Sequence, residues 1–243
     1  MARMARMTAD EIATGDFEAV EIGPAAARPE TAMFRRRSGQ PSRRAVLHVQ
    51  AAGDPAVPAD LGAWYTERAF HFYLAGLRLP AQAPVGARPE ARYLAAAFAD
   101  LDAACGHLRQ ADGMARVMVS AQGRGAIAAA LWTARSSAAD ALILLAPQLP
   151  AGTSLSLEID CPVLVLCDPA AAAARPSPRG WPVRRRTALA DRAGLQLGGH
   201  VTWLRLPAEP AGQAGGADRR VFFAELGRWL GAYMYGQVRD QLL

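Results

Sequence analysis

Short apolar runs alternate with amphipathic segments along most of the chain. Several runs rich in aliphatic and β-branched residues have the length of buried strands. They are residues 44–50, 70–77, 117–121, 140–146, 162–167 and 201–206. Between two of them, apolar residues recur at helical spacing after Pro89, at Leu94, Phe98, Leu101 and Leu108. The alternation predicts an α/β protein with a mostly parallel, doubly wound sheet covered by helices on both faces.

Two shorter segments precede this pattern. Residues 17–22 and 31–35 are short runs of mixed apolar and polar residues, which predict an antiparallel hairpin leading into the sheet. Residues 1–15 show no such pattern and are expected to form a flexible arm. The remaining residues, 16–243, have the length of one α/β domain and contain no internal repeat or linker, so we expect a single domain.

The segment around residue 122 predicts a sharp turn between a strand and a helix. The apolar run 117–121 meets small residues and is followed by an alanine-rich helical run. Strand, turn and helix in this order are typical of a nucleophile elbow, Gly-x-Ser-x-Gly. We place Gln122 at the tip and Ser120 where the first glycine would stand. Because a primary amide cannot act as an activated hydroxyl, the pattern predicts an elbow without a nucleophile.

From about Arg43 to Tyr233 the chain resembles an α/β-hydrolase of the serine-aminopeptidase-like or lysophospholipase-like group common in actinobacteria. The resemblance rests on four stretches and on their order. These are residues 70–78, which resemble an aromatic fourth strand, 120–125 at the elbow, 160–166 before the acid position, and 225–233 in a closing helix. The resemblance implies an α/β-hydrolase fold.

The same resemblance implies a degenerate catalytic triad. The three triad positions are occupied by Gln122, Asp168 and Ala211, and the loop from Pro207 to Gln213 that would carry the base contains no histidine. Family members usually insert a helical cap before the seventh strand. Here only residues 148–160 are available, which implies a reduced or absent cap and an open cleft.

Ligands of parallel sheets bind outside the carboxyl ends of the strands. We therefore expect a ligand site formed by residues that follow different strands. They are Gln50, Ala51, Arg78, Leu79, Gln122, Gly123, Pro147, Gln148, Leu149, Asp168 and Glu209. Two roles stay open for Gln122, which could bind a ligand carbonyl or cap local backbone groups. Asp168 could likewise serve the site or cap a following helix.

Composition narrows the set of partners. The net charge of +5 is carried by arginine alone, and its clusters lack interleaved aromatic residues, so we expect a solvated surface and no nucleic acid. The three cysteines have no metal spacing, and we expect neither metal nor cofactor. No apolar run reaches about 18 residues and no signal peptide is readable, so we expect a cytoplasmic protein without membrane contact, as a monomer or homodimer.

Two functions fit an elbow without a nucleophile. The first is a non-hydrolytic enzyme, an isomerase or epimerase, that tailors a bulky natural product or a modified ribosomal peptide. It would be similar to the atypical α/β-hydrolase peptide epimerase of bottromycin-type biosynthesis, with the base supplied by the substrate itself. The second is a non-catalytic pseudo-hydrolase that binds a ligand or a partner protein. Fold alone does not decide between them.

Overall fold

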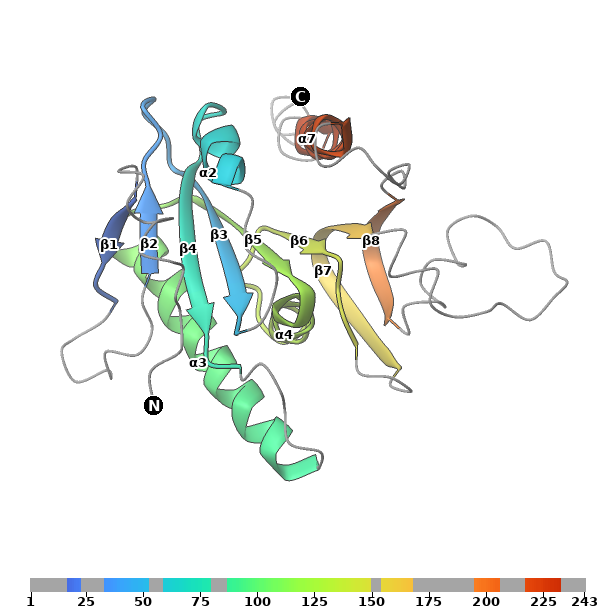
Figure 1. Cartoon of the computed structure of the whole chain (residues 1–243). Helices are drawn as coiled ribbons and strands as arrows, with labels where there is room; N and C mark the ends of the chain where they lie inside the picture. The colour runs from blue at the N-terminus through green and yellow to red at the C-terminus, as the bar shows by residue number, and fades with distance from the viewer. Residues whose placement is uncertain are drawn as a thin grey trace, which may run out of the picture.

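The computed structural model describes residues 17–22, 33–52, 59–79, 87–149, 154–167, 195–205 and 217–232. Within them, one 8-stranded sheet runs in the order β1-β2-β4-β3-β5-β6-β7-β8 (Figure 1). The strands are β1 Glu18–Val20, β2 Met33–Arg36, β3 Arg44–Ala51, β4 His71–Leu77, β5 Arg116–Gln122, β6 Ala141–Leu145, β7 Leu155–Cys167 and β8 Leu195–Arg205. The predicted N-terminal arm, residues 1–15, lies outside the described residues.

The sheet is mixed in the way that the sequence predicted. Strands β4, β3, β5, β6, β7 and β8 pair in parallel, whereas β1 pairs antiparallel with β2 and β2 antiparallel with β4. The predicted hairpin is therefore confirmed, and it adds two antiparallel strands beside β4. All carboxyl ends of the parallel strands lie along one edge of the sheet, which is where a site is expected.

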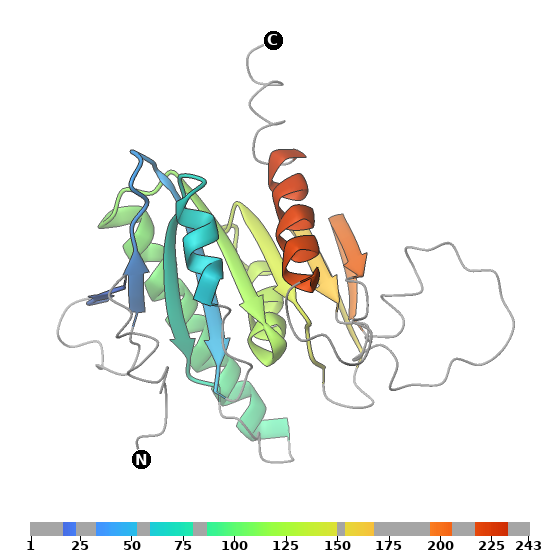
Figure 2. The same ribbon diagram turned by 45° about the horizontal axis from the view of Figure 1, so that its top comes forward.

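Helices cover both faces of the sheet. They are α2 Ala59–Thr66, α3 Ala87–Gln110, α4 Gly123–Thr133 and α7 Ala217–Leu230. Figure 2 shows α2 and α7 on the near face and α3 and α4 behind the sheet. Two separate groups of buried residues fill the interfaces, one on each face, which confirms the doubly wound α/β class.

Strand alternation decides which side chains enter which core layer. On β3, Leu47 and Val49 belong to the layer with α3 and α4, while Val46 belongs to the layer with α2 and α7. All three are fully buried, because β3 has a strand on each side and helices on each face. This explains why the central strands read as continuous apolar runs in the sequence.

The last two strands begin earlier than the sequence predicted. The apolar runs gave strands at 162–167 and 201–206, but β7 begins at Leu155 and β8 at Leu195. The register shifts between Ile159 and Val163, where Pro162 offers no N–H to the ladder. Because the predicted strand began at residue 201, it wrongly excluded His200, which lies within β8.

The longer β7 also shortens the connection after β6. That connection spans residues 146–154, since β6 ends at Leu145 and β7 begins at Leu155. This length cannot hold a cap of several helices between β6 and β7.

Candidate functional site

The strand–turn–helix predicted around residue 122 is present. Strand β5 ends at Gln122 and helix α4 starts at Gly123. Gln122 has an extended backbone with φ −121° and ψ 152°, whereas Gly123 has φ 57°. The left-handed residue of the sharp turn is thus Gly123, and our placement of Gln122 at the tip is off by one residue.

The corrected register changes what stands at the tip. Ala121 and Gly125 now occupy the two small-residue positions that flank an elbow, with Gly123 between them. The tip therefore carries no side chain at all. The backbone N–H that follows the tip, which contributes to an oxyanion hole in working elbows, belongs to Arg124 and not to Gly123.

The structure brings several of the predicted site residues to one edge. Gln50 and Ala51 end β3, beside Gln122 at the end of the parallel neighbour β5. The backbone N–H of Gln148, after β6, donates to the carbonyl of Gly123 at 2.9 Å. These contacts place three strand ends side by side, as the sequence predicted.

The end of β4 joins the same edge. The backbone N–H of Ala52 donates to the carbonyl of Leu79 at 3.2 Å. The side chain of Leu79 is buried, while Pro147 and Leu149 are half-buried and Gln148 is exposed. The predicted positions Asp168, Glu209 and Ala211 lie outside the described residues, so their roles stay predictions.

Arg78 differs from its predicted role. Its guanidinium donates to Asp100 Oδ1 on α3 at 2.8 Å, and its backbone N–H donates to Asp100 Oδ2 at 3.0 Å. The Asp100 side chain is 2% exposed. A buried carboxylate needs such a partner. Arg78 therefore neutralises a charge of the α3 layer, on the face opposite α2 and α7.

A buried histidine–serine contact lies behind the turn. His48 on β3 and Ser120 on β5 are register partners, and His48 Nδ1 lies 3.1 Å from Ser120 Oγ. Both side chains are buried, and desolvation lowers the pKa of His48 to about 4. His48 lies within the predicted buried strand 44–50 and is buried as that prediction implied, but the sequence did not predict the contact. The matched strand register would have been the signal for it.

His48 Nε2 and Gln122 Oε1 have no hydrogen-bond partner, and both atoms are shielded from solvent. His48 and Gln122 point to the α2 and α7 side of the sheet, because positions 46, 118 and 120 alternate in phase with them. Such unpaired buried atoms are uncommon and require an explanation.

Other chemistry is limited among the described residues. No group of three His, Cys, Asp or Glu side chains there could hold a metal ion. Burial raises the pKa of Cys105 to about 12 and that of Cys161 to about 11, so neither is a ready nucleophile. None of the described helices is long and apolar enough to cross a membrane.

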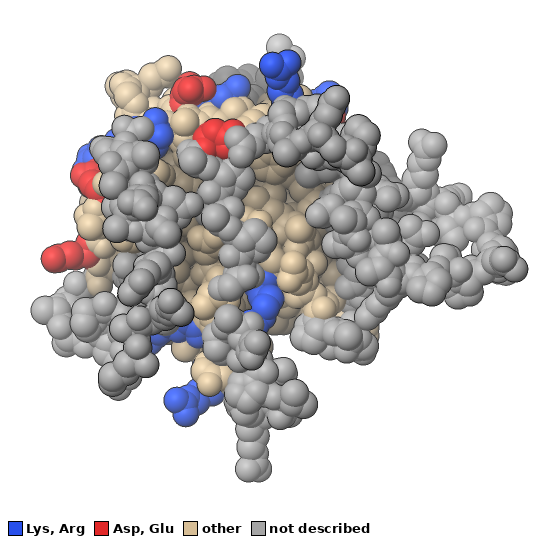
Figure 3. All heavy atoms as spheres, viewed as in Figure 1, with Lys and Arg blue, Asp and Glu red and all other residues tan. Residues whose placement is uncertain are grey.

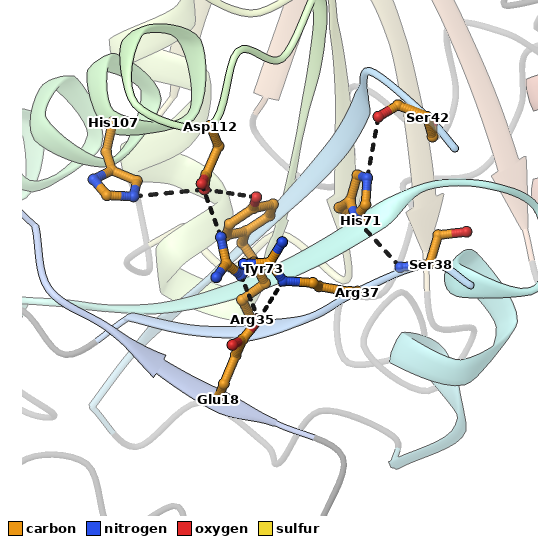
Figure 4. A network of polar contacts seen from close by, with 9 residues as sticks. All are labelled: Glu18, Arg35, Arg37, Ser38, Ser42, His71, Tyr73, His107 and Asp112. Carbon is orange, nitrogen blue, oxygen red and sulfur yellow. Dashed lines mark hydrogen bonds and ion pairs between the residues drawn. The ribbon is translucent and has the colours of Figure 1, made fainter. Parts of the chain in front are cut away.

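A second polar network lies away from the candidate edge, between the hairpin and α3 (Figure 4). Asp112 accepts hydrogen bonds from Arg35 Nη1 and from the hydroxyl of Tyr73, each at 2.8 Å. Arg35 also donates to Glu18 at 2.7 Å, and His107 Nε2 lies 3.5 Å from Asp112. The network ties β1, β2 and β4 to the end of α3.

Charges on the described surface are mixed. Figure 3 shows basic and acidic side chains interspersed on the face viewed in Figure 1. A depression of about 400 Å³ lies near the amino end of β4 and contains side chains of both signs. It is lined by Arg36, Arg37, Gly39, Gln40, Thr66 and Glu67. It therefore lies at the edge opposite the predicted ligand site.

Comparison with solved structures decides the fold. Esterase 2 of Thermogutta terrifontis, phosphoramylated by tabun, matches with a TM-score of 0.57 and 14% identity over 89% of this chain and 94% of that chain. A Klebsiella pneumoniae protein described as a dienelactone hydrolase matches with a TM-score of 0.57 and 15% identity over 89% and 99%. The chain has the α/β-hydrolase fold. TT1662 of Thermus thermophilus has the same likeness, with a TM-score of 0.54 and 13% identity over 88% and 97%.

These similarities establish the fold and not the activity, because all three sequence identities are low. No family model and no curated protein matches the sequence. The α/β-hydrolase fold expected from the sequence is thus confirmed, while activity has to be argued from the site itself.

Proposed function

We propose that this chain is a non-hydrolytic α/β-hydrolase-fold protein that binds a bulky ligand, such as a modified peptide, through uncharged groups at the carboxyl edge of its sheet. One observation carries the proposal: the left-handed residue at the elbow tip is Gly123. Covalent hydrolysis on this fold needs a side-chain nucleophile at that point. Glycine supplies none.

The nearby alternatives do not replace the missing nucleophile. The hydroxyl of Ser120 is paired with His48, as in a working serine–histidine pair, but Ser120 is 1% exposed. A substrate carbonyl cannot approach a hydroxyl that is enclosed between strands and helices. The pair is consequently a feature of the core and not a catalytic dyad.

The described side chains at the edge favour contact with uncharged groups of a ligand. Gln50, Gln122 and Gln148 present amides there, and the charge of Arg78 is engaged by Asp100. Leu149 and Pro147 add half-buried apolar surface. A site of apolar walls with a few orienting polar groups is the usual composition of a small-molecule or peptide site.

Epimerisation or isomerisation is the second candidate. The observation that favours it is the same set of uncharged groups, which can hold a substrate in one pose without supplying a base. A substrate carboxylate would then remove the proton from an acidified Cα–H and return it to the opposite face. The protein would contribute orientation and exclusion of water. The net reaction transfers no electrons and neither consumes nor releases a proton.

A fluorophosphonate probe tests the proposal directly. We expect no covalent adduct by intact-protein mass spectrometry and no hydrolysis of p-nitrophenyl esters above background. A stoichiometric adduct would overturn the proposal. Epimerisation is separated from simple binding by incubation of candidate peptides in D₂O. Uptake of one deuterium at Cα supports the enzyme, while binding without uptake supports a pseudo-hydrolase.

A further inference from the structure

The connection between β2 and β3 crosses the amino end of β4. In the sheet, β4 lies between β2 and β3, and it begins at His71. The connection, residues 37–43, therefore passes His71 on its way from one strand to the other. Figure 4 shows the imidazole between Ser38 and Ser42, near the two ends of this connection.

Both ring nitrogens of His71 hold the connection. The backbone N–H of Ser38 donates to His71 Nδ1 at 3.3 Å, and His71 Nε2 lies 3.1 Å from the carbonyl oxygen of Ser42. A backbone N–H can only donate, and a carbonyl can only accept. Nδ1 must therefore carry the lone pair and Nε2 the proton, so this geometry requires the neutral imidazole.

The two serine side chains attach the same connection to the end of α2 and the turn that follows it. Ser38 Oγ donates to the carbonyl of Thr66 at 3.0 Å, and Ser42 Oγ donates to the carbonyl of Ala69. The N–H of Gln40 donates to Ser38 Oγ at 3.1 Å. Hydroxyl and peptide groups do not titrate in the pH range of histidine. Among these contacts, only those of the imidazole can respond to a proton.

We propose that His71 is a proton-controlled latch: its neutral imidazole closes the connection over β4, and its protonation releases the Ser38 end. A proton on Nδ1 replaces the acceptor of the Ser38 N–H by a second donor, so that hydrogen bond is lost. The bond from Nε2–H to Ser42 remains and is strengthened by the charge. The connection should therefore open at Ser38 and stay attached at Ser42.

The charges on the same side of the sheet are engaged with one another. Strand alternation places Tyr73 on the side of β4 that carries His71, and its register partner Arg35 on the same side of β2. The pairs are Arg35 with Glu18 and Asp112, Arg37 with Glu18, and Asp112 with Tyr73 and His107. None of these described carboxylates contacts His71, so a protonated ring gains no ion pair from them.

The remaining charges nearby are mostly cationic. Arg36 and Arg44 lie in phase with the core layer of α2 and α7, on the side of the sheet opposite to the imidazole. Arg43 donates to a backbone carbonyl at 3.0 Å, and the exposed Glu67 lies 3.7 Å from Arg68. An additional positive charge on the ring is better accommodated in water than among these groups, which favours the open connection.

The connection also borders the depression near the amino end of β4. Gly39 and Gln40, at its centre, line that depression together with Thr66 and Glu67 at the end of α2. Release of the Ser38 end loosens this wall. Access to the depression should therefore increase as the pH falls.

The test follows the full-length, ¹⁵N-labelled protein by NMR between about pH 8 and 5. At the upper limit the ring of His71 should be the Nε2–H tautomer. The amide signal of Ser38 should shift with the same midpoint as the ring signals. Below that midpoint its hydrogen-exchange protection factor should fall at least about fivefold, because one hydrogen bond is lost. The amide of Arg44, which donates to Ser42 Oγ, should keep its protection.

His71→Gln is the informative variant, because a primary amide offers an acceptor and a donor but does not titrate. In this variant the protection of Ser38 should not depend on pH. His107→Gln is the matched control: His107 is also half-buried, but it contacts Asp112 and not the connection. It should leave the response of Ser38 unchanged.

Three outcomes would overturn the inference: an Nδ1–H tautomer of His71 at pH 8, a Ser38 signal that does not follow the ring, or a pH response that persists in His71→Gln. Loss of protection at Ser38 and Arg44 together, in step with the central strands, would assign the change to global unfolding and refute the latch. The inference goes beyond the proposed function and does not involve the elbow. A fluorophosphonate adduct would refute that function and leave the latch untouched.

Discussion

Arg78 Nη2 and Asp100 Oδ1 lie 2.7 Å apart, and the carboxylate is almost completely buried. The pair links the end of β4 to α3. Sequence position alone suggested a ligand contact for Arg78. Its partner shows that the side chain turns away, toward a buried charge that it has to neutralise.

Arg78→Met should therefore lower the free energy of unfolding by about 3 kcal/mol, since the buried Asp100 carboxylate loses its cationic partner and keeps the hydrogen bond from the backbone N–H of residue 78. Urea unfolding measures the change. Arg37→Met is the control: Arg37 is 61% exposed and pairs with the half-exposed Glu18, so its loss should cost less than about 1 kcal/mol. A stability loss for Arg78→Met no larger than for Arg37→Met would show that the buried pair is not structural.

Asp112 is the centre of the network in Figure 4, and its removal should weaken the attachment of the hairpin. Asp112→Ala removes the acceptor of the buried Tyr73 hydroxyl, while Arg35 keeps its hydrogen bond to Glu18. We expect a loss of about 2 kcal/mol in urea unfolding. Glu67→Ala, at a 71% exposed side chain, should change stability by less than about 0.5 kcal/mol. Equal effects of the two substitutions would contradict the structural role of the network.

The sequence contained enough information for most of the sheet. The continuous apolar runs predicted β3 and β5, and the elements between them predicted the helices on both faces. The prediction failed for the first halves of β7 and β8. In Leu155–Asp160 and Leu195–His200, polar or glycine residues interrupt the apolar ones. These two halves pair with each other. Because neither half is a continuous apolar run, the criterion that located the central strands did not detect them.

The candidate site was predictable in location but not in detail. Parallel strands imply that Gln50 and Gln122 meet at one edge, and they do. The elbow register was missed by one residue because Ala121 and Ser120 are both small enough for the first small-residue position. Only the backbone angles of Gln122 and Gly123 separate the two registers. The internal partner of Arg78 could not be predicted, since Asp100 lies in another element.

Acid should destabilise the protein through His48. Its pKa is about 4 when folded and near 6.5 when unfolded, so between these values the unfolded state binds the additional proton. Stability should fall by up to roughly 3 kcal/mol as the pH drops from 6.5 to 4. His48→Phe should flatten this part of the profile, while His200→Gln, at an exposed position, should leave it unchanged. An unaltered slope in His48→Phe would assign the acid sensitivity to other groups.

A second acid window should lie below the first. Arg35 and Arg37 hold the pKa of Glu18 at about 2 through hydrogen bonds to its carboxylate. Its contribution is present above the unfolded pKa of 4.5 and is lost as the pH falls toward 2. Because Glu18 is largely exposed, solvent screening keeps that contribution small. Glu18→Gln should change stability slightly at pH 5 and not at pH 2. A Glu18→Gln effect confined to the range from 6.5 to 4 would contradict this assignment.

Gly123→Ser is the strongest test of the missing nucleophile, because it places a hydroxyl at the left-handed residue of the turn. A serine there should cost about 1–2 kcal/mol in backbone strain and leave the fold intact. It should not create an efficient esterase, since His48 is buried and held by Ser120 and so cannot activate the new hydroxyl. Gln122→Ser, one residue earlier, serves as the register control and should be equally inactive. Turnover of p-nitrophenyl acetate by Gly123→Ser within the ordinary enzyme range of about 1–10³ s⁻¹ would reveal a base in the protein. In that case the chain would be a hydrolase that has lost only its nucleophile.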